Sequence, residues 1–201
     1  FDGGILRLRA NQAELFQRIR AGDIDVRSGG VFVDTQEFYV SLYSGPVLGG
    51  GATAGFEGVG KVTKLGSGTL TLPNVNAHTG GTEVQEGTLL MEGAGTIGAA
   101  GGKTTVSGGT LDLGGTTQTQ NGGVLLSAGS IVNGTLFTDT NTFDMRDGTV
   151  DATFAGSGDL SKTTGGTVTL SGANTYTGST TIFDGLLTVN GSIASSHLLS
   201  V

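Results

Sequence analysis

Apolar residues alternate with Thr, Ser or Asp in short runs along most of the chain. Clear examples occupy residues 69–72 (TLTL), 88–91 (TLLM), 110–113 (TLDL) and 167–170 (TVTL). A period of two places Leu and Val on one face of a strand and the polar residues on the other. A glycine stands directly before each run, and glycine allows the positive-φ backbone of a tight turn. The pattern predicts an all-β chain of many short strands with glycine at the corners.

A long internal repeat organises these strands. Residues 58–93 align without a gap with residues 156–191 at an offset of 98, and 14 of the 36 positions are identical. A solenoid stacks equivalent positions over one another, so the constant spacing favours it over an antiparallel sandwich, whose hairpins prefer tight turns such as Asn-Gly. The candidate structural motif comprises Gly58, Gly60, Lys64, Gly68, Leu72, Asn76, Gly80 and Gly87 in the first copy, and Gly156, Gly158, Lys162, Gly166, Leu170, Asn174, Tyr176, Gly178 and Gly185 in the second.

The repeat and the distribution of charge divide the chain, which we expect to be one β-helical segment over residues 1–201. Residues 1–44 carry 11 of the 27 charged residues and are expected to form N-terminal turns or a cap. The first repeat motif occupies residues 58–93 and the second occupies residues 156–193. Residues 94–155 would then form the intervening turns.

One segment departs from the strand pattern and predicts a short helix near residues 11–21. Asn11 would be its N-cap, and Gly22 would end it. Leu15, Phe16 and Ile19 would share one face of this helix. The rest of the chain is too rich in glycine for long helices, because each glycine costs about 1 kcal/mol in a helix relative to Ala.

Composition and charge exclude several classes of protein. The chain has 39 glycines, 2 prolines and no cysteine, and the glycines do not recur at every third position. This excludes collagen, disulfide bonds and thiol chemistry. No apolar stretch approaches the length of a membrane-spanning helix. The net charge of −7 argues against a nucleic acid partner, because phosphate binding needs a basic patch. Since the chain begins with Phe rather than Met, we expect a fragment of a longer protein.

A group of four aspartates is the first candidate for chemistry: Asp139, Asp144, Asp147 and Asp151. These residues could bind calcium or supply the paired carboxylates of a β-helical enzyme that degrades polysaccharide. The chain lacks the G-G-x-G-x-D-x-U-x nonapeptide of calcium-binding β-rolls. Solvated aspartates in turns are therefore the favoured interpretation.

Other motifs match known sites only in part. Residues 93–98 (GAGTIG) fit G-x-G-x-x-G, and residues 102–104 (GKT) match the end of a P-loop. No βαβ unit surrounds either motif, so neither predicts a nucleotide site. The two histidines are His78 and His197, and no G-x-S-x-G motif accompanies them. His78 occupies the position that Tyr176 holds in the second repeat, which favours a structural role.

The arginines near the N-terminus could form a patch for an anionic glycan. They are Arg7, Arg9, Arg18, Arg20 and Arg27. Five acids are interleaved with them between Asp2 and Asp34, so a surface of mixed charge is favoured. From these patterns we predict no catalytic residue, no metal ion and no cofactor.

The second repeat resembles a known family. Residues 156–192 (GSGDLSKTTGGTVTLSGANTYTGSTTIFDGLLTVNGS) are similar to the autotransporter-associated repeat, also called the passenger-associated transport repeat. That motif reads roughly G-x-L-x-K, then G-T-L-T-L-x-G-x-N-x-Y-T-G-x-T-x followed by V or I, then G-x-L-x-V. Residues 58–93 resemble a weaker copy, which departs from the motif at Pro73, Asn74 and His78.

The resemblance implies a right-handed, single-stranded parallel β-helix in the passenger of a type V secreted protein from a Gram-negative bacterium. Its partners would be the rest of the passenger and a C-terminal β-barrel translocator in the parent protein. A host receptor, a matrix component or a glycan is a further candidate partner, and so is a second copy bound through the β-helix ends. The location would be the bacterial cell surface, the outer membrane or the medium into which the passenger is secreted.

The function implied by the resemblance is that of a non-catalytic stalk or adhesin scaffold, which supports export and folding of the passenger and serves adhesion or virulence. The alternative is a β-helical enzyme that acts on extracellular polysaccharide. The chain has no Trp, no clustered acid and base residues and no long basic groove, and this argues against the enzyme.

Overall fold

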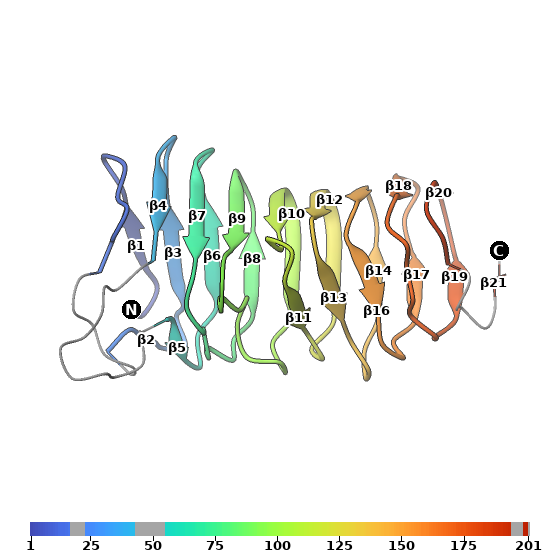
Figure 1. Ribbon diagram of the computed structural model, residues 1–201, viewed down its shortest axis with the longest axis horizontal. Helices are drawn as coiled ribbons and strands as arrows, with labels where there is room; N and C mark the ends of the chain where they lie inside the picture. The colour runs from blue at the N-terminus through green and yellow to red at the C-terminus, as the bar shows by residue number, and fades with distance from the viewer. Residues whose placement is uncertain (17–22, 43–54, 194–198, 201) are drawn as a thin grey trace.

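The computed structural model describes residues 1–16, 23–42, 55–193 and 199–200, which form one elongated rod (Figure 1). Within these ranges the chain forms twenty-one strands and no helix. The strands are β1 (Gly4–Arg7), β2 (Asp25–Val26), β3 (Val31–Asp34), β4 (Tyr39–Ser41), β5 (Glu57–Gly58), β6 (Val62–Leu65), β7 (Thr69–Leu72), β8 (Thr82–Val84), β9 (Thr88–Met91), β10 (Thr104–Asp112), β11 (Thr117–Thr119), β12 (Val124–Val132), β13 (Thr135–Phe137), β14 (Phe143–Met145), β15 (Gly148–Val150), β16 (Thr153–Ala155), β17 (Leu160–Lys162), β18 (Thr167–Leu170), β19 (Thr180–Ile182), β20 (Leu186–Val189) and β21 (Leu199–Ser200).

Parallel pairing joins these strands into a coil. The longest ladder runs β1-β3-β6-β8-β10-β12-β14-β17-β19-β21, so strands stack in chain order along the rod (Figure 1). Within it, Val62 pairs with Thr82 and Thr82 pairs with Thr104, which are steps of 20 and 22 residues. All strand pairs in the described residues are parallel. The predicted parallel β-solenoid is therefore confirmed, and the sandwich is wrong.

Two further faces of the coil carry shorter ladders. Strands β4, β7 and β9 pair in order up to β10, and β15, β18 and β20 pair in order from β12. The nine-residue strands β10 and β12 belong to the longest ladder and also pair with the shorter ones, β10 with β9 and β12 with β15. Their mutual register shifts after Val106 and again after Ser107, where the pairing of β10 passes from β8 to β9. Strands β11, β13 and β16 form a separate parallel sheet, and β2 pairs with β5.

The apolar core lies inside the coil. In β7, Leu70 and Leu72 are buried whereas Thr69 and Thr71 are partly exposed, as the alternation predicts. Leu70 pairs in register with Leu89 of β9, so an apolar residue of one turn meets an apolar residue of the next. Burial of a side chain of this size stabilises the fold by about 1.5–3 kcal/mol. A single cluster of buried apolar side chains extends along the described part of the rod.

The helix predicted near residues 11–21 is wrong for the part that the structure describes. Gln12 forms a parallel bridge with Val40, and its backbone N–H donates to Tyr39 O at 2.9 Å. The N–H of Leu15 donates to Ser41 O at 3.0 Å. In a helix capped by Asn11, the N–H of Leu15 would donate to Asn11 O, so its bond to the next turn of the coil shows that this helix does not form. The remaining predicted helix residues, including Arg18, Ile19, Arg20 and Gly22, lie outside the described residues.

Glycine corners allow successive turns to approach one another closely. A Cβ atom built on Gly80 would lie 2.3 Å from the carbonyl carbon of Gly60, and one on Gly178 would lie 2.3 Å from Gly158 O. These pairs are equivalent in the two repeats. Gly58 and Gly156 must be glycine for a second reason, which is that their φ angles are 98° and 100°. Such positive φ values are unfavourable for residues with a side chain.

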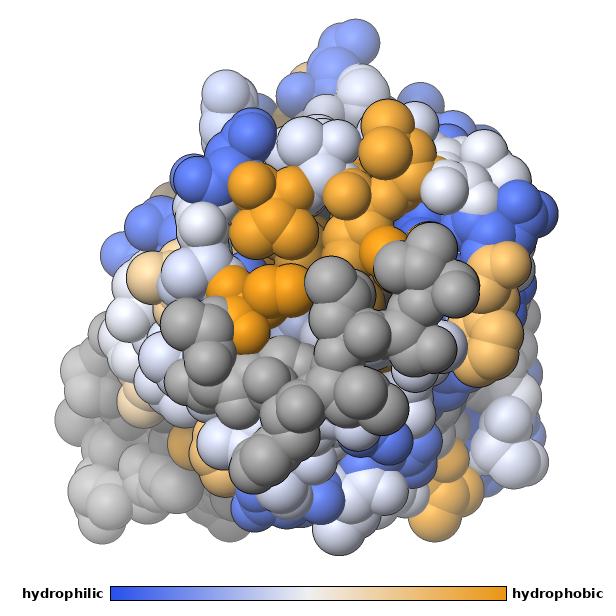
Figure 2. Space-filling model, turned by 90° about the vertical axis from the view of Figure 1, so that its right-hand side faces the viewer, coloured by the Kyte–Doolittle hydropathy of each residue, from blue (hydrophilic) through white to orange (hydrophobic). Residues whose placement is uncertain are grey.

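The C-terminal end of the rod exposes apolar side chains, which gather there in Figure 2. Phe183, Leu186 and Val189 have exposed fractions of 69%, 56% and 37%. Strand β20 pairs with β18 on one edge and has no further partner among the described strands. Within the described residues, β20 is thus an open strand edge beside an apolar surface, whereas β19 is covered by β21. No described segment forms an apolar helix of the length that crosses a membrane.

We expect Gly178→Ala to destabilise the rod, because the added methyl group would meet the backbone of Gly158 rather than a flexible side chain. Overpacking of this kind typically costs about 1–3 kcal/mol. Chemical denaturation followed by circular dichroism measures the loss. The matched control is Gly101→Ala, because a Cβ atom on Gly101 would meet nothing within 4 Å. Equal stability of the two variants would contradict close approach at this corner.

Candidate functional site

A buried lysine in each repeat links two turns of the coil. Lys64 and Lys162 have no exposed surface. The ammonium group of Lys64 donates to Gly66 O at 2.7 Å and to Glu86 O at 3.1 Å. The ammonium group of Lys162 makes the equivalent bonds, to the carbonyl of Thr164 and to Asp184 O, the latter at 3.1 Å. Both acceptors are thus displaced by 98 residues together with the lysine, so the contact belongs to the repeat.

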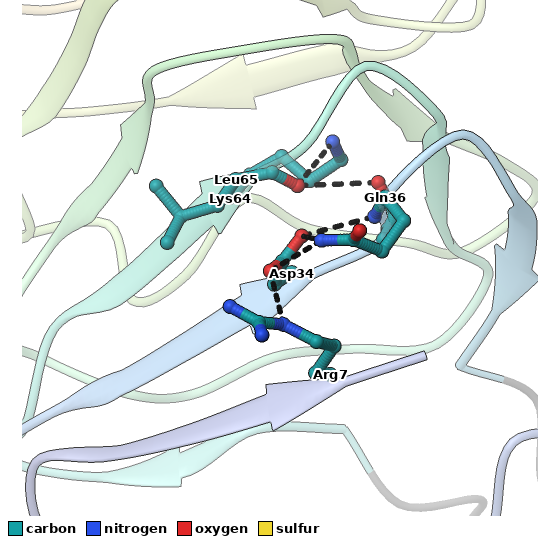
Figure 3. Close-up of polar contacts among 6 residues, drawn as sticks. Arg7, Asp34, Gln36, Lys64 and Leu65 are labelled. Atoms are coloured by element: carbon teal, nitrogen blue, oxygen red, sulfur yellow. Dashed lines mark hydrogen bonds and ion pairs between the residues drawn. The ribbon is translucent and has the colours of Figure 1, made fainter. Parts of the chain in front are cut away.

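Strand β3 places a carboxylate near the first of these lysines (Figure 3). Asp34 accepts from Arg7 Nε at 2.8 Å and from Gln36 Nε2 at 2.7 Å. Burial raises the pKa of Asp34, but the hydrogen bonds from Gln36 and Arg7 outweigh burial and hold the pKa below its ordinary value. Burial lowers the pKa of Lys64 to about 8, and the charges of Asp34 and Glu86 partly offset this. Lys64 therefore remains mostly protonated at neutral pH and can donate to all its carbonyl acceptors.

A buried asparagine in each repeat satisfies backbone groups of neighbouring turns. Asn76 Oδ1 accepts from Phe56 N at 2.7 Å in the preceding turn, and Asn76 Nδ2 donates to Thr96 O at 2.7 Å in the following turn. Asn174 Oδ1 accepts from Phe154 N at 2.8 Å in the same way. Unpaired backbone groups inside the coil would be unfavourable, and these amides supply the missing partners.

The position two residues after each asparagine is also buried and differs between the copies. His78 Nε2 lies 2.9 Å from Thr82 Oγ1, and the Tyr176 hydroxyl lies 2.6 Å from Thr180 Oγ1. Both rings have no exposed surface. The inward-facing side chains of the repeats thus form one set, which we call the inter-turn contacts: Lys64, Asn76, His78 and Thr82 in the first copy, and Lys162, Asn174, Tyr176 and Thr180 in the second.

Five residues of this set belong to the motif that the sequence predicts to be structural, namely Lys64, Asn76, Lys162, Asn174 and Tyr176, whereas the two threonines do not. Thr82 and Thr180 are identical in the two copies, which was the available signal. Phe56 and Phe154 pack beside the inter-turn contacts, yet they lie just before the aligned residues. Phe154 stacks on Phe143 with ring centroids 4.2 Å apart. Asp34 lies outside the repeat altogether, so no repeat comparison could have found it.

The four aspartates do not form a joint site. Asp139 Oδ1 accepts from Ser157 N at 3.1 Å in the next turn and is exposed. Asp144 Oδ2 pairs with Arg146 Nη2 at 2.8 Å. Asp147 and Asp151 are exposed. Within the part of the chain that the structure describes, no three His, Cys, Asp or Glu side chains are grouped so that they could hold a metal ion.

Asp144 is held in its ionised form. Burial raises the pKa of this carboxyl, but hydrogen bonds from Arg146 and Thr163 and the charge of Arg146 outweigh burial and lower the pKa below its usual value. The Thr163 hydroxyl donates to Asp144 Oδ1 at 2.7 Å. Both carboxylate oxygens are therefore bound, and a lowered pKa is unsuited to the proton donor of glycoside cleavage.

The remaining candidates are dispersed. Residues 93–98 form a turn after β9, and no helix follows them, so they lack the context of a phosphate site. Arg7 pairs with Asp34, and Arg27 Nε lies 3.3 Å from Asp25 Oδ2. Arg9 is exposed. Arg18, Arg20 and His197 lie outside the described residues.

We expect Asn76→Ala to destabilise the rod by roughly 3 kcal/mol, because buried backbone groups of Phe56, Asn74 and Thr96 lose a partner, each worth about 1–3 kcal/mol. Urea unfolding measures the change in stability. Asn190→Ala is the control, since Asn190 is exposed. A loss no larger than that of the control would show that Asn76 does not hold the turns together.

Comparison with known proteins shows which family the two repeats match. Residues 62–91 and 160–189 match the family described as the passenger-associated transport repeat. Over 140 residues, or 65% of its length, the chain is 39% identical to the adhesin BmaC autotransporter of Brucella suis biovar 1 (strain 1330). The chain spans about 4% of the length of that relative. No solved structure matches the chain. The predicted family resemblance is confirmed: the chain carries two passenger-associated transport repeats, and most of it is similar to part of an autotransporter adhesin.

Proposed function

We propose that this segment is a non-catalytic stalk in the passenger of a Gram-negative autotransporter adhesin. The observation that carries the proposal is the uninterrupted parallel ladder, in which both repeats make equivalent contacts between turns. Such a ladder gives a long, stiff element whose turns are each supported by their neighbours. A stalk of this kind would hold a binding region away from the cell and serve adhesion or virulence.

Location and partners follow from the same proposal. The segment would lie on the bacterial surface, at the outer membrane or in the secreted passenger. Its partners would be the rest of the passenger and a C-terminal translocator, with a host receptor, matrix component or glycan bound elsewhere along the passenger or on this rod. The exposed side chains of Phe183, Leu186 and Val189 support stacking of another β-helical turn or a second copy on this end.

The repeats would also assist export and folding of the passenger. Most of the motif residues that we predict to be structural are glycines at the corners or the lysines and asparagines of the inter-turn contacts, whose side chains hydrogen-bond to adjacent turns. Folding of one turn therefore prepares the surface on which the next turn is added. Outside the membrane, this stepwise gain in stability would favour continued movement of the chain in one direction.

In the parent autotransporter, we expect the double variant Lys162→Met with Asn174→Ala to reduce surface display of the passenger several-fold, because the second repeat loses contacts to both adjacent turns. Antibody labelling of intact cells measures display, and blotting of whole cells measures total synthesis. The control double variant is Lys103→Met with Asn190→Ala, since both residues are exposed. A second variant lacks residues 156–193. If surface display and protease resistance are unchanged in both the double variant and this deletion, a role in export is contradicted.

The enzyme alternative is tested separately on the purified chain. The bound state of Asp144 supports the non-catalytic proposal, so we expect no turnover of pectin, alginate or other glycans. Clear activity that is lost in Asp144→Asn would overturn the proposal and favour a β-helical polysaccharide-degrading enzyme.

A further inference from the structure

His78 is enclosed by groups that carry no charge. Its ring has no exposed surface and meets the ring of Phe56 edge to face, with centroids 6.2 Å apart. On the other side, the backbone of Gly98 lies so close that a Cβ atom there would stand 3.0 Å from His78 Nε2. Thr82 provides the side-chain hydrogen bond at 2.9 Å. The imidazole therefore sits in the interior of the coil, between turns.

The hydrogen-bond chain fixes which ring nitrogen carries the proton. Thr82 Oγ1 donates its hydrogen to Ile97 O at 2.6 Å. A hydroxyl has one hydrogen, so Thr82 Oγ1 can only accept from the ring, and His78 Nε2 must be the donor. Nδ1 then holds the lone pair, and it is buried without a hydrogen-bond partner in the described structure. A proton on Nδ1 would therefore place a charge inside the coil, where only backbone groups of Phe56 and Gly81 favour it.

The second repeat contains no such titratable group at the equivalent position. There the Tyr176 hydroxyl lies 2.6 Å from Thr180 Oγ1, and the ring packs against Phe143 with centroids 6.0 Å apart. A tyrosine hydroxyl stays neutral throughout the acid range. The two repeats thus share one scaffold but differ in whether acid can place a charge inside it.

We propose that His78 makes the first repeat an acid-sensitive joint of the rod, which loosens when Nδ1 is protonated while the second repeat stays closed. A charge on the buried ring would disfavour the packed state and favour opening of the turns that meet at His78, where solvent can hydrate the imidazolium. This goes beyond the stalk role, because it gives one point along the stalk a response to pH.

Neighbouring charged groups do not stabilise the charged ring. On β6, Lys64 directs its ammonium group at carbonyls, and it is itself a cation. On β8, Glu83 accepts from Lys61 Nζ at 2.5 Å and is engaged there. Glu86 follows β8 and is exposed. The ring thus lies among Phe56, Gly81, Thr82 and Gly98, of which the backbone groups of Phe56 and Gly81 offset only part of the effect of burial on a positive charge.

The direction of the pH effect follows from where the proton is bound. Burial lowers the pKa of His78 from 6.5 to about 4, with backbone hydrogen bonds as a smaller opposing effect. Below pH 6.5 the open state therefore binds a proton that the closed state does not, and opening becomes more favourable as pH falls towards 4. Between pH 7 and pH 5 these pKa values predict an increase in opening on the order of 20-fold.

Backbone hydrogen exchange at pH 7 and pH 5, corrected for the intrinsic exchange rates, tests the proposal on the whole chain. We expect amides of residues 78–84 to lose protection on the order of 20-fold relative to those of residues 176–182. In His78→Tyr this difference should vanish, and His197 is present in both proteins, so it cannot account for the change. Equal loss in both repeats, or an undiminished loss in His78→Tyr, would overturn the proposal.

A second measurement does not depend on any variant folding. An NMR titration of the His78 ring in the unaltered chain should leave its signal unchanged from pH 7 to pH 5.5, as expected of a buried neutral imidazole. An ordinary titration with a midpoint near 6.5 would show that the closed structure accepts the charge, and this would overturn the proposal.

Discussion

The rod depends on how closely successive turns approach one another at the glycine corners. Gly80 faces the backbone of Gly60, and Gly178 faces that of Gly158, with room for a hydrogen atom but none for a methyl group. This approach keeps adjacent strands at the roughly 4.8 Å that their hydrogen bonds require. It also sets each turn directly over the last, so that residues at equivalent positions form columns along the rod.

Such columns allow polar side chains to be buried. The ammonium group of Lys162 reaches a carbonyl of the following turn, and the amide of Asn76 reaches both adjacent turns. A turn on its own would leave these groups without partners in an apolar interior, where each unpaired group is unfavourable. Each turn therefore needs its neighbours, and the coil gains stability by extension rather than within single hairpins.

Alternation in residues such as Leu70 and Leu72 was enough to predict strands, and the constant offset of 98 predicted that equivalent residues stack. The roles of Lys64 and Asn76 could not be predicted, because their partners lie in other turns and lysine is usually exposed.

For residues 11–16 the sequence predicted an element that the structure does not contain. Their local pattern favours a helix, but hydrogen bonds to β4 outweigh that preference. Asp144, which the sequence placed in a turn, lies in strand β14.

Differences between the two repeats follow from the same columns. In the second copy, a Cβ atom on Gly172 would lie 2.1 Å from Ala152 O, so the preceding turn leaves no room for a side chain. The first copy has Asn74 at this position, and its side-chain amide donates to Leu42 O at 3.2 Å. A close backbone contact is thus replaced by a side-chain contact to the preceding turn. What the repeat preserves is a contact between turns, and a residue can change wherever the adjacent turn offers it another partner.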